Sequence, residues 1–454
     1  MINSGRILAR MVLDRVEQNE SYANLALHEV LAGHPQVEQR ERAFCTELVY
    51  GTLRNLLKID FILGRLLSRP LPSLKVPVKN TLRVAIYQLL FLPEIPERAV
   101  CHAAVEQVKA SRFSGLAGMV NGVIRSFLRT RNQLSWPDRD SQPVEFLSVT
   151  YSHPAWLVER WLNRWGWELT ERLLAIDNEK PPLTVRMNRL RSDFADLRRE
   201  LTAAGVELAN GRWLDEALTV QSLPGALEDL VAFRDGKLFA QDESSMLVAH
   251  LVNPSPGETV IDLCAAPGGK STHLAELMNN SGTVYSIDDH PHKINLIAEN
   301  AARLGISVIA PQLADARQFG PPDTATIDAI LVDAPCSGTG VLRRRVDARY
   351  RRQPEDSAEL IRLQREILDH AAELVKPGPG GRIVYSTCTL EPEENQEQIR
   401  WFCEKHPEFQ PVNWRGFLPS RLVADLADAT APWANVLPSS GGGDGFFLCR
   451  LEAR

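Results

Sequence analysis

The chain has 454 residues, 44% of them hydrophobic and 24% charged, a composition that excludes disordered and fibrous proteins and predicts two or three globular domains. No apolar run reaches the length of a membrane-spanning helix, and the first residues lack the apolar core of a secretory signal, so we expect a cytoplasmic protein. The net charge of −6 does not favour nucleic-acid binding, yet residues 1–150 carry 19 Lys and Arg against 14 Asp and Glu, which makes the front of the chain mildly basic.

Residues 1–140 are predicted to form an all-α domain of five to seven helices. Apolar residues recur there at three- and four-residue spacing, as an amphipathic helix requires, and prolines separate the segments. The last of these helices has a basic face. The predicted helices span residues 6–16, 40–57, 56–67, 78–90, 101–110 and 121–131.

A polar, proline-containing stretch over residues 130–143 predicts a linker, and a small α+β module is expected after it, over residues 145–235. The module begins with a tryptophan-rich helix, and alternating apolar and polar residues further on predict strands. Helices are predicted over residues 154–167 and 192–203, and strands over 182–188 and within 206–220.

A third domain is expected over residues 236–454, where short apolar strands alternate with helices. This pattern predicts a mostly parallel sheet that helices cover on both faces. A final apolar run over residues 446–451 would add a strand that can pair antiparallel. The other predicted strands span residues 259–263, 283–287, 307–310, 329–332 and 382–386, and the helices 271–278, 292–304, 358–374 and 393–406.

The most specific segment is VIDLCAAPGGKS, residues 260–271, in which an apolar strand runs into a Pro-Gly-Gly turn and a helix start. Glycines let the backbone approach a ligand closely, and a helix N-terminus favours a negative group such as a carboxylate. The ending GKS is similar to that of a P-loop, but a P-loop requires glycine where Cys264 stands, and Pro267 interrupts the loop. We therefore reject a P-loop and expect a different ligand-binding turn.

Acidic residues recur where successive strands end. Asp288 ends the second strand, Asp315 follows the third, and Asp333 ends the fourth. In open α/β sheets ligands bind outside the carboxyl ends of the strands, and an acid after the second strand suits hydrogen bonds to both ribose hydroxyls. A single such acid is more often a helix cap, but three of them beside a glycine-rich turn favour a nucleoside cofactor.

The seven cysteines are widely spread and form no C-x-x-C pair, which argues against a zinc site or a disulfide framework and favours reduced thiols. Most buried cysteines act as small apolar residues. Cys336 and Cys388, however, follow the fourth and fifth strands into turns at the expected ligand-binding edge, so we predict a functional role for both. A packing role is predicted for Cys45, Cys101, Cys403 and Cys449.

The strings LCAAPGGKS, DAPCSGTG, YSTCT and GGDGFF carry a resemblance to a known family. They are similar to motifs of the RNA cytosine-5 methyltransferases, and the chain resembles most the bacterial ribosomal RNA branch, the RsmB (Sun/Fmu) type. That branch carries an N-terminal domain similar to the antitermination factor NusB, which RAFCTELVYGTLR (residues 42–54) and VNGVIR (residues 120–125) resemble. The likeness covers nearly the whole chain.

This resemblance implies a NusB-like RNA-binding domain, a small α+β module and a Rossmann-like methyltransferase domain that uses S-adenosyl-L-methionine. It implies that Asp288 holds the cofactor's ribose, that Asp315 lies on the adenine side, and that Asp333 lies near both the cofactor and the reacting base. Cys388 would be the nucleophile and Cys336 the second catalytic cysteine. The implied contacts of the cofactor's methionine end are Cys264, Ala265, Ala266, Pro267, Gly268, Gly269 and Lys270.

Two smaller features bear on the same comparison. Val346 stands where the family often has a proline, and this departure concerns the local loop shape. The segment DESS, residues 242–245, resembles the motif that precedes the cofactor turn and is expected to line its pocket.

The reaction that the resemblance implies is methylation of carbon 5 of a cytidine in small-subunit (16S) ribosomal RNA, by a monomeric enzyme without a metal. Attack of the Cys388 thiolate on carbon 6 would make carbon 5 nucleophilic. Asp333 in a protonated form, which requires a raised pKa, would hydrogen-bond to N3, and Cys336 would assist release. The base must leave its helix or be presented unpaired.

Several alternatives stay open at this stage. The same chemistry could act on another RNA such as tRNA, or the chain could be a catalytically silent RNA-binding factor. DNA cytosine-5 methyltransferases also have a Pro-Cys motif, in which that cysteine is the nucleophile, but YSTCT and the NusB-like segments favour RNA. A thiol redox protein is disfavoured because no C-x-x-C is present.

Overall fold

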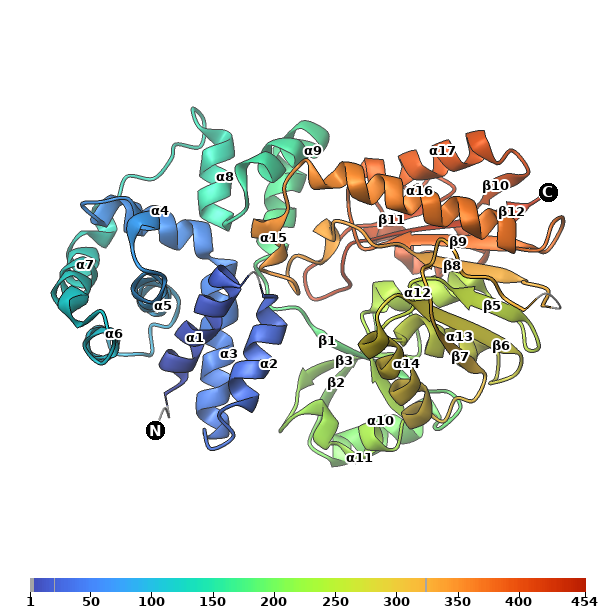
Figure 1. Cartoon of the computed structure of the whole chain (residues 1–454), viewed down its shortest axis with the longest axis horizontal. Coiled ribbons are helices and arrows are strands. Elements are labelled where there is room, and N and C mark those ends of the chain that lie inside the picture. The colour runs from blue at the N-terminus through green and yellow to red at the C-terminus, as the bar shows by residue number, and fades with distance from the viewer. Residues whose placement is uncertain (1–3, 20, 323–324) are drawn as a thin grey trace. The chain divides into compact units, whose positions relative to one another are not determined.

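The computed structural model describes residues 4–19, 21–322 and 325–454, and Figure 1 labels its helices and strands. No helix among these residues combines the length and the apolar character needed to cross a membrane.

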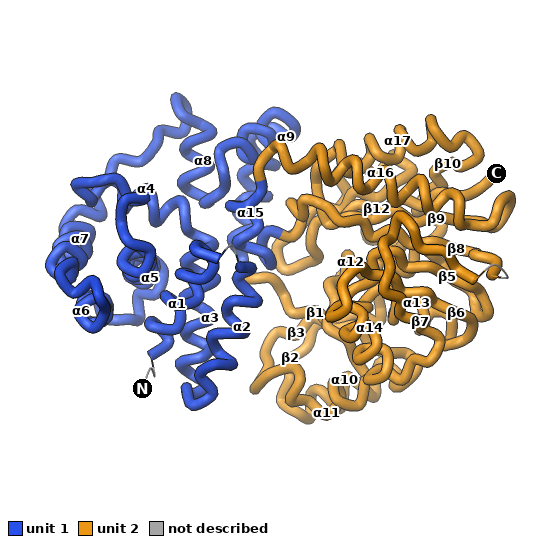
Figure 2. Tube along the Cα trace, viewed as in Figure 1, with its two compact units in different colours: residues 1–179, 342–352 blue, residues 180–341, 353–454 orange. Residues whose placement is uncertain are grey.

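The chain divides into two compact units, which Figure 2 shows in blue and orange. Unit 1 comprises Met1–Glu179 and Leu342–Arg352, and unit 2 comprises Lys180–Val341 and Gln353–Arg454. The boundaries between the two units differ from the boundaries predicted for the three domains. Two helices beyond residue 140, and residues 342–352 late in the chain, pack with unit 1.

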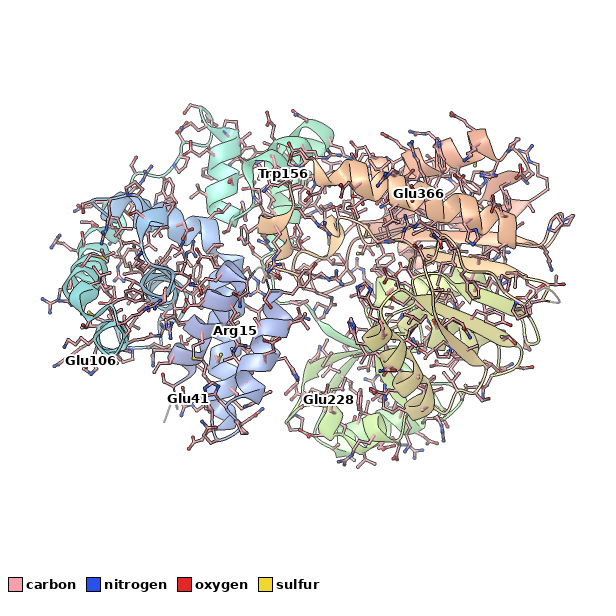
Figure 3. The ribbon with its side chains drawn as sticks, in the orientation of Figure 1. Arg15, Glu41, Glu106, Trp156, Glu228 and Glu366 are labelled. Carbon is pink, nitrogen blue, oxygen red and sulfur yellow. The ribbon has the colours of Figure 1, made fainter. Side chains whose placement is uncertain are left out.

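Unit 1 opens with the predicted all-α fold. Its helix α2 was missed by the sequence prediction, because ten mostly apolar residues give little contrast between an apolar and a polar face. Glu41, labelled in Figure 3, accepts the Gly5 N–H at 2.6 Å and so connects the start of α1 to α3. The helices are α1 (Gly5–Gln18), α2 (Ala23–Ala32), α3 (Gln39–Arg54), α4 (Leu56–Leu66), α5 (Val76–Phe91), α6 (Glu97–Lys109) and α7 (Ala117–Thr130).

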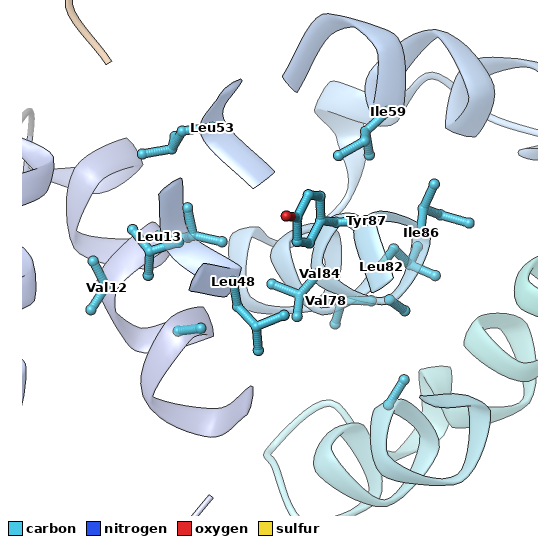
Figure 4. Packing of buried hydrophobic residues seen from close by; sticks show 14 of the residues in the cluster. Val12, Leu13, Leu48, Leu53, Ile59, Val78, Leu82, Val84, Ile86 and Tyr87 are labelled. Atoms are coloured by element: carbon cyan, nitrogen blue, oxygen red, sulfur yellow. The ribbon is translucent and has the colours of Figure 1, made fainter. Parts of the chain in front are cut away.

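Helices α1, α3 and α5 form the centre of the unit 1 core, part of which is shown in Figure 4. The Tyr87 ring of α5 lies against α3, and its hydroxyl donates a hydrogen bond to Glu47 at 2.6 Å. A Cβ atom on Gly51 would lie 2.0 Å from this ring. The two helices can therefore approach each other this closely only with glycine at position 51.

Two further helices follow in unit 1: α8 (Pro143–Tyr151) and α9 (Ala155–Ile176). Helix α9 continues past the predicted end at residue 167, through a kink at Gly166, where φ is +71°. A left-handed backbone of this kind is tolerated best by glycine, which lets the apolar side chains of the second half turn back to the core.

Residues 342–352 return to unit 1 late in the chain and contain α15 (Ala348–Arg351). The buried Arg349 side chain donates to the Asp177 carbonyl oxygen at 2.9 Å, and the Tyr350 hydroxyl donates to the Leu53 carbonyl oxygen at 2.8 Å. Val346 is fully buried in the hydrophobic core of the unit. The valine that stands in place of the family's frequent proline thus adds apolar surface to this core.

Unit 2 begins with a sheet in the order β2-β3-β1-β4, in which each pair is antiparallel, as expected for the α+β module. Its own core contains the fully buried Val185, Leu197 and Leu218. Strand β4 was not predicted, because three residues are too few to show alternation. The elements are β1 (Leu183–Met187), α10 (Phe194–Ala203), β2 (Glu207–Asn210), β3 (Ala217–Ser222), α11 (Val231–Arg234) and β4 (Leu238–Ala240).

The second sheet of unit 2 is the predicted Rossmann-like sheet, with the strand order β10-β12-β9-β8-β5-β6-β7. The five strands from β9 to β7 are parallel neighbours. Strand β12 pairs antiparallel with β9, which confirms the prediction for the last strand. The strands are β5 (Thr259–Asp262), β6 (Thr283–Asp288), β7 (Ile309–Leu313), β8 (Ala329–Asp333), β9 (Arg382–Thr387), β10 (Phe409–Val412), β11 (Ala434–Val436) and β12 (Phe446–Ala453).

Helices cover both faces of this sheet, as predicted. Val260 of β5 belongs to a core that includes α12, α13 and α14, whereas the next residue, Ile261, belongs to a core that includes α16 and α17. Successive strand residues point to opposite faces, so each strand contributes to both cores. The helices are α12 (Glu243–Val252), α13 (Gly269–Leu277), α14 (Pro291–Leu304), α16 (Asp356–Leu374) and α17 (Gln396–Lys405).

Candidate active site

The carboxyl ends of neighbouring parallel strands bring the predicted site residues to one edge of the large sheet. Strand β5 ends at Asp262, β6 at Asp288, β8 at Asp333 and β9 at Thr387. Because β9, β8, β5 and β6 are adjacent and parallel, the loops that follow them leave the sheet side by side. A ligand that binds at this edge can contact residues from four loops.

The predicted cofactor turn lies between β5 and α13. Gly268 has a φ of +96° and donates its N–H to the Ala265 carbonyl oxygen at 2.7 Å, and α13 begins at the next residue. Behind the turn, the Ser271 hydroxyl donates to the fully buried Asp262 at 2.6 Å. Burial raises the pKa of Asp262 to about 7. The turn thus directs the positive end of α13 toward the strand edge, where a carboxylate ligand would be stabilised.

Asp288 lies beside this turn and is 8% exposed. Its Oδ2 atom accepts the Ala266 N–H at 3.3 Å. Its Oδ1 atom is buried and accepts no hydrogen bond from the residues that the structure describes, although the Lys293 ammonium lies 3.0 Å from it. An acceptor in this state fits a cofactor that donates hydroxyl groups, as the ribose of S-adenosyl-L-methionine does.

Asp333 forms an ion pair with Lys270, a residue of the cofactor turn. The Lys270 Nζ atom lies 2.7 Å from Asp333 Oδ2, and the Ser386 hydroxyl donates to Oδ1 at 2.8 Å. Burial alone would lower the pKa of Lys270, but the adjacent Asp333 raises it. Both Asp333 oxygens accept hydrogen bonds, an arrangement that suits the ionised carboxylate, whereas the family resemblance implied a protonated form opposite a bound base.

The two predicted catalytic cysteines meet at this edge. Their Sγ atoms lie 3.4 Å apart, and both side chains are half-buried. The hydrogen bond to Cys388 and burial both raise the pKa of Cys336 well above its usual value. The four cysteines with a predicted packing role lie elsewhere, Cys45 in the unit 1 core and Cys101, Cys403 and Cys449 on α6, α17 and β12.

Backbone hydrogen bonds join three of the sequence motifs at Gly340. Its N–H donates to the Cys388 carbonyl oxygen at 3.0 Å, and the Gly445 N–H donates to the Gly340 carbonyl oxygen at 2.8 Å. A Cβ atom on Gly340 would lie 2.4 Å from the Gly445 carbonyl oxygen. The strings DAPCSGTG, YSTCT and GGDGFF are therefore parts of one site, and Phe446 of the last string lies under the Lys270 ammonium, 5.2 Å from its ring centroid.

The motif DESS starts α12 and also reaches this region. The Asp242 side chain caps the helix through the Ser244 N–H at 3.0 Å and accepts the Asp444 N–H at 3.1 Å. The Ser244 hydroxyl donates to the Asp444 carbonyl oxygen at 2.7 Å. Both side chains hold the GGDGFF loop, a contact that the sequence analysis did not specify.

Asp315 is the most exposed of the three predicted strand-end acids. It lies two residues beyond β7, and its carboxylate accepts hydrogen bonds from Arg317, including one from Nη2 at 2.6 Å. These bonds lower the pKa of Asp315. Strand β7 is the parallel neighbour of β6, so Asp315 lies at the same sheet edge as Asp288. Asp315, however, already accepts hydrogen bonds from Arg317.

Sequence reasoning missed a buried polar cluster behind the two cysteines, formed by Ser337, Thr389, Glu394 and Asn395. The only sequence signal was the string EPEEN directly after YSTCTL, which was assigned to the start of a helix. In the structure the 3-10 turn η6 (Pro392–Glu394) precedes α17, and Glu391, Glu394 and Asn395 of the string are buried.

Comparisons with known proteins cover the whole chain. The family model "16S rRNA methyltransferase RsmB/F" matches residues 249–452, the NusB family model matches residues 3–129, and a ferredoxin-like domain of RsmF/B-like methyltransferases matches residues 153–224.

Full-length relatives and solved structures match as well. A Bacillus subtilis (strain 168) protein named "Probable ribosomal RNA small subunit methyltransferase B" is 41% identical over 99% of this chain and 99% of its own length. An Erwinia tasmaniensis protein named "Ribosomal RNA small subunit methyltransferase B" is 33% identical over 99% of both chains. The crystal structure of PH0851 covers 100% of this chain and 99% of its own at 28% identity, with a TM-score of 0.82.

Proposed function

The chain belongs to the RsmB/F family of methyltransferases and uses S-adenosyl-L-methionine, and we propose that it methylates carbon 5 of a cytidine in small-subunit (16S) ribosomal RNA. The names of the full-length relatives support the ribosomal RNA substrate. The observation that carries the carbon-5 chemistry is the cysteine pair, with sulfurs 3.4 Å apart, at the strand edge that also holds the Asp333–Lys270 ion pair.

The first step is attack by Cys388. Carbon 5 of cytosine is a poor nucleophile, but addition of a thiolate to carbon 6 converts the ring to an enamine that can take up a methyl group at carbon 5. A free thiol with a pKa of about 8.5 is only a few per cent thiolate at neutral pH, so the site must activate it. The Lys270 ammonium interacts electrostatically with Cys388, and a nearby positive charge favours the thiolate.

Asp333 stabilises the negative charge that the attack of the thiolate places on the ring. A hydrogen bond from a protonated Asp333 to N3 would neutralise that charge. The proton that Cys388 gives up as it becomes a thiolate can supply this acid form of Asp333. The Lys270 ammonium, 2.7 Å from Asp333 Oδ2, keeps its own proton, because Asp333 raises the pKa of Lys270.

Cys336 assists the release of the product. When carbon 5 loses its proton to a water molecule, the carbon–sulfur bond breaks and the electron pair returns to the Cys388 sulfur. Because the pKa of Cys336 is raised, this residue stays a thiol and can donate a hydrogen bond to the departing sulfur 3.4 Å away. That donation stabilises the leaving thiolate.

The cofactor turn and the neighbouring strand ends would hold S-adenosyl-L-methionine, which supplies an electrophilic methyl group when bound. Residues 264–270 would surround its methionine end, with the carboxylate at the N-terminus of α13. Asp288 would accept hydrogen bonds from the ribose, and Asp315 would face the adenine.

We assign the activity to a cytoplasmic monomer that binds its RNA with the help of the NusB-like domain. Two alternatives use the same site residues. One is the same chemistry on another RNA such as tRNA, and the other is a catalytically silent RNA-binding factor. The intact cysteine pair and the cofactor turn favour catalysis over the silent factor.

Two single variants test the roles of the cysteines. Cys388→Ala should transfer no methyl group and form no covalent RNA adduct, whereas Cys336→Ala should attack and methylate and then stall with RNA attached. A denaturing gel with 16S ribosomal RNA and cofactor should show a retarded, protease-sensitive band for the Cys336 variant alone. The reverse pattern would assign the nucleophile to the Pro-Cys motif, as in the DNA enzymes.

Substrate controls complete this experiment. RNA that contains 5-fluorocytidine should trap the wild-type enzyme, because fluorine cannot leave carbon 5 as a proton does, and the trapped band should vanish in Cys388→Ala. Parallel incubations with 16S ribosomal RNA, tRNA and DNA identify the substrate. Methyl transfer to tRNA alone would replace the ribosomal assignment.

A further inference from the structure

The two cysteines of the active site lie on separate loops, and a single buried carboxylate binds both of these loops. Glu394 is 0% exposed. Its Oε2 atom accepts the Ser337 N–H at 2.9 Å, and its Oε1 atom accepts hydrogen bonds from the hydroxyls of Ser337 and, at 3.4 Å, Thr389. Ser337 directly follows Cys336, and Thr389 directly follows Cys388. This side chain therefore connects the residues that come after each cysteine, in addition to the direct hydrogen bond between the Ser337 and Thr389 hydroxyls at 2.7 Å.

The next residue holds the Cys388 loop from both sides. Asn395 is also 0% exposed. Its Oδ1 atom accepts a hydrogen bond from the Thr387 hydroxyl at 2.5 Å, and its Nδ2 atom donates to the Thr389 carbonyl oxygen at 2.9 Å. Asn395 thus spans the three residues centred on Cys388, and it binds neither Ser337 nor any other residue of the Cys336 loop among its described contacts.

A buried carboxylate is costly unless hydrogen bonds satisfy it. Glu394 receives a further hydrogen bond at Oε2 from Gln364 of α16, at 2.9 Å, so its position is fixed from the helix layer behind the sheet. Burial raises the pKa of Glu394, while these donors act in the opposite direction. The donors to the Glu394 carboxylate are Ser337 and Thr389 of the two loops and Gln364 of α16. These hydrogen bonds therefore fix the positions of the loops.

From these contacts we propose that Glu394 and Asn395 are positioning residues that set the distance between the two cysteine sulfurs, a proposal that rests on the proposed function. Glu394 fixes both loops relative to each other, and Asn395 fixes the Cys388 loop alone. Sulfur placement matters because attack on carbon 6 and hydrogen bonding to the departing sulfur both require contact distances, and a shift of about 1 Å can reduce the rate about 100-fold.

The different contacts of the two residues predict different chemical signatures. In Glu394→Ala both Cys336 and Cys388 should be alkylated by iodoacetamide several-fold faster than in the wild type, measured peptide by peptide with mass spectrometry. In Asn395→Ala the change should be larger at Cys388 than at Cys336, which is affected only through its contact with Cys388. Identical signatures in the two variants, or unchanged alkylation, would overturn the proposal. The alkylation rates are measured without RNA and without turnover, so they test the positioning of the cysteines independently of the proposed reaction.

The catalytic readout is the single-turnover rate of adduct formation on 5-fluorocytidine RNA. Glu394→Ala should reduce this rate at least about tenfold at saturating RNA, with unchanged affinity for RNA and cofactor. Glu394→Gln should restore the rate to within about threefold, because its amide fits the same space and the two hydroxyls can turn to accept from it. A glutamine variant as slow as the alanine variant would show that the charge acts instead, and would refute positioning.

Controls separate positioning from general damage. Glu397→Ala removes the same charge from an exposed residue in the first turn of α17 and should behave as the wild type in both readouts. Loss of cofactor affinity in Glu394→Ala, measured by calorimetry, would indicate a collapsed domain and a structural role only. If that variant does not fold, Asn395→Ala still decides the question through the larger change at Cys388 than at Cys336.

Discussion

Asp288 and Asp289 are adjacent acids that share Lys293 as an ion-pair partner but differ in burial, and this difference determines which of them can bind a buried ligand. The Asp288 side chain is 8% exposed, and the Asp289 side chain is 62% exposed. A buried acceptor without a donor costs about 1–3 kcal/mol, which a ligand hydroxyl can recover. The exposed Asp289 carboxylate already has His290 and Lys293 as partners, so it has little to gain from the cofactor.

Asp288→Ala should therefore weaken S-adenosyl-L-methionine binding by roughly 1–3 kcal/mol, the cost of losing hydrogen bonds to a charged acceptor. Asp289→Ala is the matched control, because it removes the same group one residue away and should leave the affinity unchanged. Isothermal calorimetry measures both. Equal affinities in the two variants would exclude Asp288 from the ribose site.

Strand-end residues could be located from the sequence, whereas side-chain partners could not. Asp333 ends an apolar strand and Cys388 directly follows one, so their common edge was predictable from the rule for parallel sheets. The ion pair of Asp333 with Lys270 joins residues 63 positions apart, and the bonds of Glu394 depend on which way a buried turn points. The local periodicity of the sequence indicates neither this ion pair nor the orientation of the Glu394 side chain.

In unit 2 a buried acid, Glu216, contacts two histidines that lie on two different helices. Glu216 lies just before β3, His250 on α12 and His273 on α13. The nearest histidine nitrogens lie 2.5 Å and 3.5 Å from Glu216 Oε1. Burial and the nearby Arg186 lower the pKa of His273 to about 3, so this ring is neutral in the folded protein.

This histidine should make the folding stability depend on pH. The unfolded chain takes up the proton near pH 6.5 but the folded chain only near pH 3, so stability falls as the pH is lowered between these values. The slope contributed by this one group approaches about 1.4 kcal/mol per pH unit. Urea unfolding at pH 7, 6 and 5 should show a smaller loss in His273→Gln than in the wild type.

The comparison is made with a chelator present, because Glu216, His250 and His273 lie close enough together to hold a metal ion. Parallel stability curves for the wild type and the variant would mean that His273 titrates normally in the folded protein.

Most helices and strands were predictable within a few residues, and the missed ones have identifiable physical causes. Helix α12 is buried along almost its whole length, so it has no polar face to reveal a period of 3.6 residues. Strands β4 and β11 have three residues each, too few for alternation to be recognised. The segment at residues 342–352 could not be assigned to unit 1 because its packing partners lie far away in the sequence.

For the whole molecule, the charge distribution bears on how a chain with a net charge of −6 binds RNA. The arginines of the basic helix predicted from the sequence, Arg125, Arg129 and Arg131, are exposed on and next to α7 of unit 1. Arg131 forms an exposed ion pair with Glu97 at 2.9 Å, which is weak in water and can open for a phosphate. A local basic face can attract RNA despite the overall negative charge.

Neutralising these three arginines to glutamine should weaken RNA binding and flatten its dependence on salt, because each phosphate that an arginine neutralises releases condensed counterions. The slope of log K against log salt should become less steep by about 0.7 to 0.9 for each phosphate that is no longer neutralised. Filter binding at several salt concentrations measures the slope, and cofactor affinity should stay unchanged. A control triple at Arg40, Arg69 and Lys75, which are exposed elsewhere on unit 1, removes the same charge and should leave the slope close to that of the wild type. Equal slopes for both triples would mean that the arginines at α7 are solvated side chains of a packing domain.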